Sequence, residues 1–456
     1  MVLNSDKYIH FIGIGGISMS SLANILLHRG YKVSGSDSKE SALTAELKEM
    51  GAKIHIGQSA DNISDEIGLV VYTAAISDDN PELKAVREKA IENVTRAEFL
   101  GRLMQEYGNV ICVSGTHGKT TTTSLISQIF LDSEKDPTIL CGGMIPAIGG
   151  NTRIGGSEHM IAEACEYTNS FHSFFPKIAV ILNVKADHLD FFKDLDDIRA
   201  SFKKFAGLLP EDGTLVINGE IENLDYFTQD LKCNIVTYGL NGNYDYTASD
   251  ISYNEYACGR YTLVKNGEAK APVVLRITGE HNVSNSLAAA AVADVCGIDL
   301  NTACEYMGHF SGVERRFEYK GNLQGVTIID DYAHHPDEIN ATLSAALNYP
   351  HKKLWVVFQP HTYTRTISLM DDFAAALSRA DAVVLPDIYA AREKNIYGIS
   401  SGDLQKKIEE LGTESYYIPE FDDVETFLLE NCSTGDLLIT MGAGDVVNIG
   451  NSLLGK

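Results

Sequence analysis

Chemistry is suggested first by a string of glycine, lysine and threonine residues, GTHGKTTTT, which begins at Gly115. An apolar stretch, VICV, precedes it and an apolar-periodic segment follows, so we expect a strand, a loop and a helix. The common phosphate loop is G-x-x-x-x-G-K-[ST], whereas here only two residues separate Gly115 from Gly118. Lys119 would offer a positive charge to nucleotide phosphates, and Thr120 or Thr121 would offer a hydroxyl to Mg²⁺. The string therefore predicts a compact phosphate loop.

A second glycine-rich string, GIGGIS, follows the apolar stretch YIHF near the start of the chain. Gly13 and Gly15 match the first two glycines of G-x-G-x-x-G, and Ser18 stands where the third would be. A strand before the string, a helix after it and Asp37 further on are typical of a loop that brings backbone N–H groups to a pyrophosphate. NAD and UDP both carry a pyrophosphate and a ribose, so either fits, as does a tight turn without a ligand.

Acidic and histidine side chains follow two apolar stretches downstream of the phosphate loop. Glu163 and Glu166 come after HMIA, and Asp187 and His188 come after IAVILNV. Ligands bind outside the carboxyl ends of parallel strands, and carboxylates there can hold Mg²⁺. These residues are candidate metal ligands, and the alternative is that they are solvated or cap helices.

Histidines and arginines gather in the last third of the chain. DDYAHHP brings Asp330, Asp331, His334 and His335 together after an apolar stretch, and FQPHTYTRT places Arg365 after another. The side-chain amides of Asn282 and Asn285 could read an adenine edge or cap a helix. The guanidinium groups of Arg315 and Arg316 are suited to phosphate.

Alternating strand and helix patterns restart three times along the chain, which predicts parallel, doubly wound sheets. We expect an α/β protein with a Rossmann-like domain at 1–108, a central domain with a P-loop ATPase-type parallel sheet at 109–313, and a Rossmann-like domain at 314–456. Short alternating stretches with Asn-Gly turns between 233 and 278 predict a small β-rich subregion of the central domain. The segment 279–297 predicts a well-capped helix.

Composition narrows the class of protein. Of the 456 residues, 37 are basic and 62 acidic, so the net charge of −25 argues against a nucleic-acid partner. The N-terminal residues lack the pattern of a signal peptide, and no uncharged apolar run is long enough to span a membrane. The eight cysteines are scattered without a C-x-x-C pair, which is typical of reduced thiols in a cytoplasmic protein.

Together these strings resemble the Mur ligase family, whose members form amide bonds at the expense of ATP during peptidoglycan synthesis. GIGGISMS, GTHGKTTTT, NVKADHLD, GEHNVSN, RRFE, DDYAHHP, QPHTYTRT and GAGD occur in the family's order and span almost the whole chain. DDYAHHP and PHTYTRT are most similar to the forms found in members that attach L-alanine to UDP-N-acetylmuramate.

The resemblance implies roles for most of these residues. The first domain would bind the UDP part of the substrate through Gly13, Gly15, Gly16, Ser18, Asp37, Thr73, Ala74 and Arg96. The central domain would bind ATP, together with Arg315 at its boundary, through Gly115, Thr116, His117, Gly118, Lys119, Thr120, Thr121, Asn282 and Asn285. A pair of Mg²⁺ ions would be held by Thr120, Glu163 and His188. L-alanine would be held by Tyr332, His334 and Arg365, with Arg365 paired to its carboxylate.

The resemblance also implies the reaction. The γ-phosphoryl group of ATP would pass to the lactyl carboxylate of UDP-N-acetylmuramate, and the amine of L-alanine would attack the acyl phosphate. Lys119 and His188 would act at the phosphates and metal, Arg365 would hold the amino acid, and either His334 or His335 would accept the amine proton. Because three ligands meet, we expect the domains to close on binding.

The sequence departs from the family's common form at several positions. Cys165 and Thr168 replace acids of EADESD, and Thr362 replaces a basic residue of PHRYTR. Phe202 stands where some members carry a carbamylated lysine, so we expect no such modification. The alternatives are another Mur-family amide ligase with a different amino acid or peptide, a nicotinamide-dependent oxidoreductase, and an ATP-sensing module without catalysis.

Overall fold

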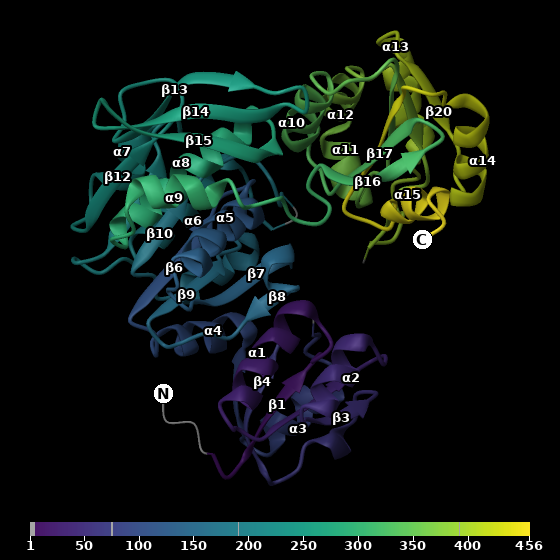
Figure 1. Ribbon diagram of the computed structural model, residues 1–456. Helices are drawn as coiled ribbons and strands as arrows, with labels where there is room; N and C mark the ends of the chain where they lie inside the picture. Colours follow the sequence, from purple (N-terminus) through teal and green to yellow (C-terminus); the bar gives the residue numbers. More distant parts are fainter. Residues whose placement is uncertain (1–4, 74–75, 190, 392) are drawn as a thin grey trace. The chain divides into compact units, whose positions relative to one another are not determined.

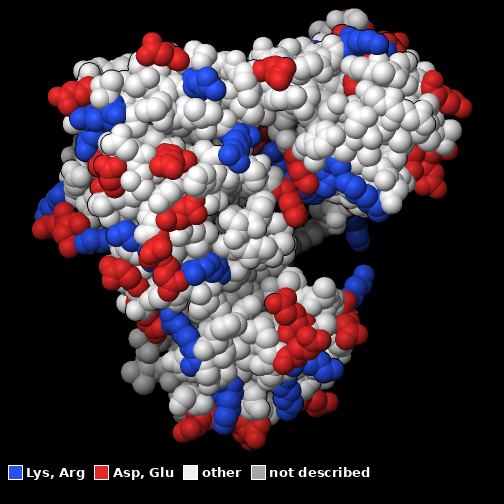
Figure 2. Space-filling model, viewed as in Figure 1, with Lys and Arg blue, Asp and Glu red and all other residues white. Residues whose placement is uncertain are grey.

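The computed structural model describes residues 5–73, 76–189, 191–391 and 393–456 (Figure 1). They form two compact units. One holds the chain up to Lys185 together with Leu195–Thr237, and the other holds Ala186–Asp194 together with Tyr238–Lys456. Among the described residues, no helix is long and apolar enough to cross a membrane. Acidic and basic side chains are interspersed on the visible face (Figure 2).

The first unit begins with a parallel sheet in which the strand order is β3-β2-β1-β4-β5. Its strands are β1 (Tyr8–Ile12), β2 (Val33–Asp37), β3 (Lys53–Ile56), β4 (Ile67–Tyr72) and β5 (Glu92–Thr95). Its helices are α1 (Ile17–His28), α2 (Ala42–Glu49), α3 (Pro81–Glu88) and α4 (Arg96–Met104). Strand β1 is central because its residues are apolar and buried, and the glycine string GIGGIS connects it to α1.

The same unit continues into a second set of strands in the order β12-β11-β10-β6-β9-β7-β8. These are β6 (Asn109–Ser114), β7 (Thr138–Ile145), β8 (Gly150–Arg153), β9 (His159–Glu163), β10 (Ile178–Ile181), β11 (Thr214–Asn218) and β12 (Asn234–Tyr238). The accompanying helices are α5 (Lys119–Asp132), α6 (Leu195–Ala206) and α7 (Leu224–Thr228). In the parallel register Val113 pairs with Glu163, and Ser114 with Ile181. The residues after β6, β9 and β10 therefore emerge at one edge.

The second unit contains an antiparallel meander of β13 (Tyr246–Tyr253), β14 (Cys258–Lys265) and β15 (Glu268–Thr278). Helices α8 (Glu280–Val295) and α9 (Leu300–Met307) follow, and α8 contacts all three strands. The β-rich subregion occurs where the Asn-Gly turns predict it. The predicted helix is present as α8, which starts after Gly279 without a side-chain cap and has Cys296 as its C-cap, with backbone N–H capping.

The second unit also carries a sheet in the order β16-β17-β21-β18-β19-β20, parallel except for β16. Its strands are β16 (Glu318–Leu323), β17 (Val326–Asp331), β18 (Leu354–Phe358), β19 (Ala382–Leu385), β20 (Glu414–Tyr417) and β21 (Leu437–Met441). Its helices are α10 (Pro336–Ala346), α11 (Tyr363–Ser368), α12 (Met370–Leu377), α13 (Ser401–Glu410), α14 (Phe421–Asn431) and α15 (Val447–Leu453). Residues of α10, α12 and α13 pack in one buried cluster and those of α14 and α15 in another, so helices cover both faces.

These sheets agree with an α/β protein that has three domains. The two compact units divide the chain at other positions than the predicted domain boundaries at 108 and 313. The boundaries of the three domains therefore stay predictions.

Candidate active site

The glycine loop after β1 is held by an acidic side chain. Gly13 has a positive φ of 85°, and the Gly15 N–H donates to Asp37 Oδ2 at 2.9 Å. A Cβ atom at Gly15 would lie 2.9 Å from Asp37 Oδ2, and one at Gly13 would lie 3.1 Å from the Thr73 methyl group. The structure thus brings Gly13, Gly15, Asp37 and Thr73 together, and their role in binding UDP stays a prediction.

The remaining residues predicted for UDP have different surroundings. Gly16 precedes α1, and Ser18 lies exposed in its first turn. Arg96 begins α4, where burial lowers the pKa of its guanidinium and the nearby Cys165 opposes that shift. Ala74 lies outside the described residues.

The loop after β6 positions Lys119 at the start of α5. Gly118 adopts a left-handed conformation, with φ of 85°, as the N-cap of this helix. The Lys119 ammonium donates to the backbone oxygens of Gly115 at 2.5 Å and Thr116 at 3.0 Å. It also pairs with Glu166 Oε2 at 3.0 Å. Burial alone would lower the pKa of Lys119, but the charge on Glu166 outweighs burial and raises it above the usual range. Lys119 is therefore charged at neutral pH.

Oxygen ligands for a cation lie next to this loop. Glu163 ends β9, and the Cys141 thiol donates to its Oε1 at 3.1 Å. The same thiol lies 3.8 Å from the backbone oxygen of Thr120. Burial raises the pKa of Cys141, so the thiol stays a neutral donor. Carboxylate and hydroxyl oxygens are ligands that Mg²⁺ accepts, so Thr120 and Glu163 stay the predicted ligands of such an ion.

In the second unit, Asp187 connects the predicted metal ligand to the predicted alanine-binding residues. Its Oδ1 accepts the backbone N–H of His188 at 2.7 Å and lies 3.3 Å from an Arg365 nitrogen. Burial acts to raise the pKa of Asp187, but His188 and Arg365 hold it well below the usual range. Arg365 was predicted to pair with a substrate carboxylate, and in the structure its guanidinium pairs with the carboxylate of Asp187.

The two adjacent histidines of DDYAHHP differ in their contacts. His334 Nδ1 lies 3.1 Å from the backbone oxygen of Tyr332 and 3.2 Å from Glu338. Burial lowers the pKa of His334 to about 4. His335 precedes α10, where its Nδ1 accepts the Asp337 N–H at 3.3 Å and its Nε2 lies 3.1 Å from the Ala186 oxygen. Backbone groups therefore face both ring nitrogens of His335.

Arg315 is tied to two strand ends of the same unit. Its guanidinium donates to Asp330 at 3.0 Å and to the backbone oxygen of Gly442 at 2.7 Å, and it lies 4.9 Å from the centre of the Tyr332 ring. Burial raises the pKa of the neighbouring Asp331 to about 6. Tyr332 and Arg315 therefore form one cluster with the ends of β17 and β21.

The asparagines predicted to contact adenine lie inside α8. Asn282 Nδ2 donates to the Thr278 oxygen at 2.8 Å, and Asn285 Nδ2 donates to Asn282 Oδ1 at 2.9 Å. Neither acts as the N-cap, so the capping alternative is wrong. The pair is buried and ordered by its own hydrogen bonds.

Glu166 and Asp187 were predicted only as candidate metal ligands, and in the structure they pair with Lys119 and Arg365. Sequence reasoning gave no role to Asn183. Asn183 follows β10 and contacts the phosphate loop. The signal that could have found it is its place in the same string as His188.

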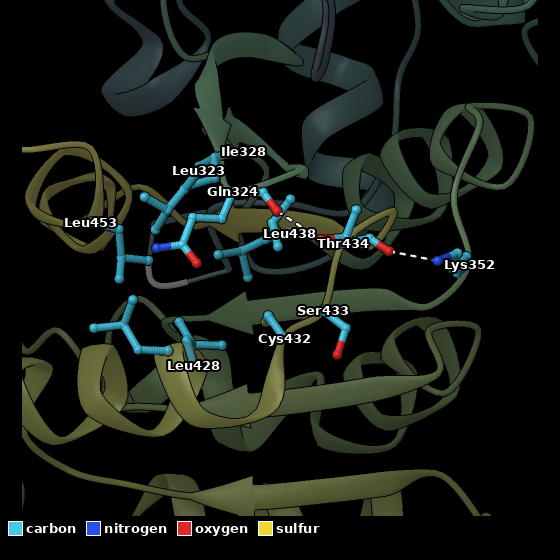
Figure 3. Close-up of a pocket in the computed structure, with 12 residues that line it drawn as sticks. Leu323, Gln324, Ile328, Lys352, Leu428, Cys432, Ser433, Thr434, Leu438 and Leu453 are labelled. Carbon is cyan, nitrogen blue, oxygen red and sulfur yellow. Dashed lines mark hydrogen bonds between the residues drawn. The ribbon is translucent and has the colours of Figure 1, made fainter.

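A cavity of about 470 Å³ lies elsewhere, in the second unit, and none of the predicted site residues lines it. Its walls include Leu323, Ile328, Leu428 and Leu438 (Figure 3). The polar groups at its rim satisfy one another, since Lys352 donates to the Thr434 backbone oxygen at 2.7 Å. The cavity therefore adds nothing to the site built above.

The strand–loop–helix units and the lysine at the start of α5 are typical of an enzyme that binds a nucleotide phosphate. The chain belongs to the Mur ligase family. Its residues 8–108 match the model of the Mur ligase catalytic domain, 113–293 the Mur ligase middle domain, and 315–444 the Mur ligase glutamate ligase domain.

Relatives within this family are similar over the whole chain. A UDP-N-acetylmuramate–L-alanine ligase of Lachnospira eligens is 57% identical over 452 residues, covering 99% of this chain and 98% of the relative. One of Agathobacter rectalis is 54% identical, with 98% of each chain covered. The crystal structure of UDP-N-acetylmuramate-alanine ligase from Thermotoga maritima superimposes with a TM-score of 0.82 at 31% identity, over 98% of both chains.

Proposed function

We propose that this protein joins L-alanine to the lactyl carboxylate of UDP-N-acetylmuramate, with ATP converted to ADP and phosphate, in peptidoglycan precursor synthesis. The observation that carries the proposal is similarity over the full length to ligases with this activity, at up to 57% identity. ATP and a UDP-sugar are cytoplasmic metabolites, so we expect the protein to act in the cytoplasm.

The chemical difficulty is that a carboxylate must accept a phosphoryl group from an anionic donor. Lys119, charged and fixed at the start of α5, neutralises negative charge as the γ-phosphoryl group moves. When ATP binds, its phosphates replace the loop oxygens and Glu166 as partners of the ammonium. Thr120 and Glu163 would hold one Mg²⁺ ion and His188 a second, and these ions would supply further charge neutralisation.

The second half-reaction needs an uncharged amine. His334 is the stronger candidate for the base, because backbone groups face both ring nitrogens of His335 whereas the contacts of His334 given above involve Nδ1. Burial lowers the pKa of His334 to about 4, so its imidazole is neutral at pH 7. Arg365 exchanges Asp187 for the alanine carboxylate, with Tyr332 beside it.

The experiment measures ADP release from ATP, Mg²⁺ and UDP-N-acetylmuramate, with and without each of twenty amino acids. We expect release that depends on L-alanine and an amide product detected by mass spectrometry. Release with a different amino acid or a peptide would favour another Mur-family specificity. ATP binding without an amide product would favour a sensing module. The nicotinamide alternative has no support, because the family match covers the first glycine loop.

A further inference from the structure

Asn183 holds the backbone of the phosphate loop from a neighbouring strand end. It lies two residues beyond β10, which is parallel to β6 and paired so that Ser114 faces Ile181. The His117 N–H donates to Asn183 Oδ1 at 2.8 Å, and Asn183 Nδ2 donates to the His117 oxygen at 3.0 Å. The Asn183 backbone oxygen also accepts the Thr116 N–H at 3.1 Å. One residue thus forms three hydrogen bonds with the loop, two as acceptor and one as donor.

Residues next to Asn183 also contact the loop at the same strand end. Thr116 Oγ1 accepts the Lys185 N–H at 2.9 Å. A Cβ atom at Gly115 would lie 2.9 Å from the Leu182 Cβ, so the backbone there approaches as closely as only glycine permits. The first half of the loop is therefore docked on residues 182–185.

This docking decides which amides are available to a phosphate. The N–H groups of Thr116 and His117 face Asn183. The N–H groups in the first turn of a helix have no carbonyl partner within that helix and favour an anion. The N–H groups available to a phosphate are then those from Gly118 onward, at the start of α5 and next to Lys119.

We propose that Asn183 is a positioning residue for ATP: its carboxamide fixes Thr116 and His117 so that the Gly118 turn and the start of α5 face the phosphates. The inference rests on the proposed function of this loop in binding ATP. The amide group is specific, because only a side chain with a donor and an acceptor side by side can bond both polar groups of one peptide residue.

The test compares Asn183→Leu with Asn218→Leu in the full chain. Leucine is close to asparagine in size but cannot form hydrogen bonds. Asn218 is a matched control, because it is also half-buried and donates Nδ2 to the Leu182 oxygen at 3.1 Å, yet it holds the strand end and not the loop. Affinity is measured with a fluorescent, non-hydrolysable ATP analogue, and KM is measured for all three substrates.

We expect Asn183→Leu to weaken ATP binding about tenfold to a hundredfold, from the loss of two hydrogen bonds. KM for UDP-N-acetylmuramate and for L-alanine should change less than about twofold, a split that general destabilisation would not give. Asn218→Leu should bind ATP as the wild type does. Wild-type ATP affinity in a folded Asn183→Leu variant, or equal weakening in both variants, would overturn the proposal.

If Asn183→Leu fails to fold, Asn183→Asp decides, because aspartate keeps the acceptor for His117 N–H and loses the donor to its oxygen. We expect an intermediate weakening confined to ATP, and unchanged affinity would overturn the proposal. Absence of L-alanine-dependent ADP release by the wild type would remove the proposed ligation but leave the ATP-binding comparison readable. The two failures are therefore distinguishable.

Discussion

The loop after β1 and the loop after β6 both lead from a buried strand into a helix, but different chemistry holds them. In the first, the carboxylate of Asp37 accepts the Gly15 N–H. In the second, the neutral amide of Asn183 holds His117, and Lys119 adds a positive charge. A loop that only binds a pyrophosphate can rely on backbone N–H groups, whereas a loop that acts during phosphoryl transfer needs charge where negative charge moves.

The supports beneath the two loops differ in the same way. Below the first, Glu82 is fully buried and accepts hydrogen bonds from Ser36 at 2.5 Å and Asn62 at 2.6 Å. His10 lies 3.9 Å from it. Burial acts to raise the pKa of Glu82, but these partners hold it below the usual value. An ionised carboxylate thus anchors the end of β2, while an uncharged amide anchors the phosphate loop.

The largest effect should come from Lys119→Ala. Removing the ammonium should lower turnover by about 10³-fold or more, because nothing else in the loop supplies a positive charge to the transferring group. UDP-N-acetylmuramate binding, measured by calorimetry, should be unchanged. Lys193→Ala is the control, since that side chain is largely exposed. Near-normal ligation by a folded Lys119→Ala variant would remove the contrast between the loops.

Removal of divalent ions should also separate the two loops. We expect chelation to lower turnover by about 10²-fold while UDP-N-acetylmuramate still binds. Glu163→Gln should require about tenfold more Mg²⁺ for half-maximal rate, because a neutral amide is a weaker ligand than a carboxylate. A Mg²⁺ dependence identical to that of the wild type would show that Glu163 is not a ligand.

A smaller effect is expected from Gly15→Ala in the first loop. The new Cβ would lie 2.9 Å from Asp37 Oδ2 and 3.0 Å from the Thr44 methyl group, so the loop must shift. KM for UDP-N-acetylmuramate should rise about tenfold with KM for ATP unchanged. Gly16→Ala should do less, because its nearest contact would be 3.4 Å away. A parallel rise in KM for ATP would contradict separate roles for the loops.

The smallest effect concerns pH. The folded-state pKa of Glu82 lies below its ordinary value of 4.5, so its contribution to stability is present above pH 4.5 and is lost as the pH falls through the folded-state pKa. Glu82→Gln should cost about 1 kcal/mol at pH 7 and make the thermal midpoint less sensitive to acid between pH 5 and 3. Matching pH profiles of the variant and the wild type would show that Glu82 is not the anchor.

Much of the fold could be predicted because local signals are strong. The apolar stretches before Gly13 and Gly115 end at glycines with positive φ, and each helix begins four residues later. Strand β16 could not be predicted in this way, since its antiparallel pairing with β17 depends on an edge position in the sheet. Helix α8 occurs where it is predicted, but its asparagines do not cap it, because Asn282 donates to the Thr278 oxygen and Asn285 to Asn282.

The sequence predicted which residues belong to the candidate site better than it predicted which of them contact one another. Lys119 was singled out, but its pairing with Glu166 depends on β9 lying beside β6. Asp187 and Arg365 are 178 residues apart, and no local pattern reports that they meet. The first contact follows from the order of strands in one sheet, and the second joins segments that follow strands of two different sheets. Short motifs encode neither.

The hydrogen bonds between Asn183 and His117 limit which sequence changes the phosphate loop can accept. Inserting two residues to restore the common loop spacing would move His117 out of reach, and the freed carboxamide would then compete with ATP for the loop's backbone groups. A longer loop is therefore incompatible with an asparagine at this strand end. Among chains of this fold, we expect the loop length and the residue at position 183 to change together, so a single insertion would be lost unless a second change accompanies it.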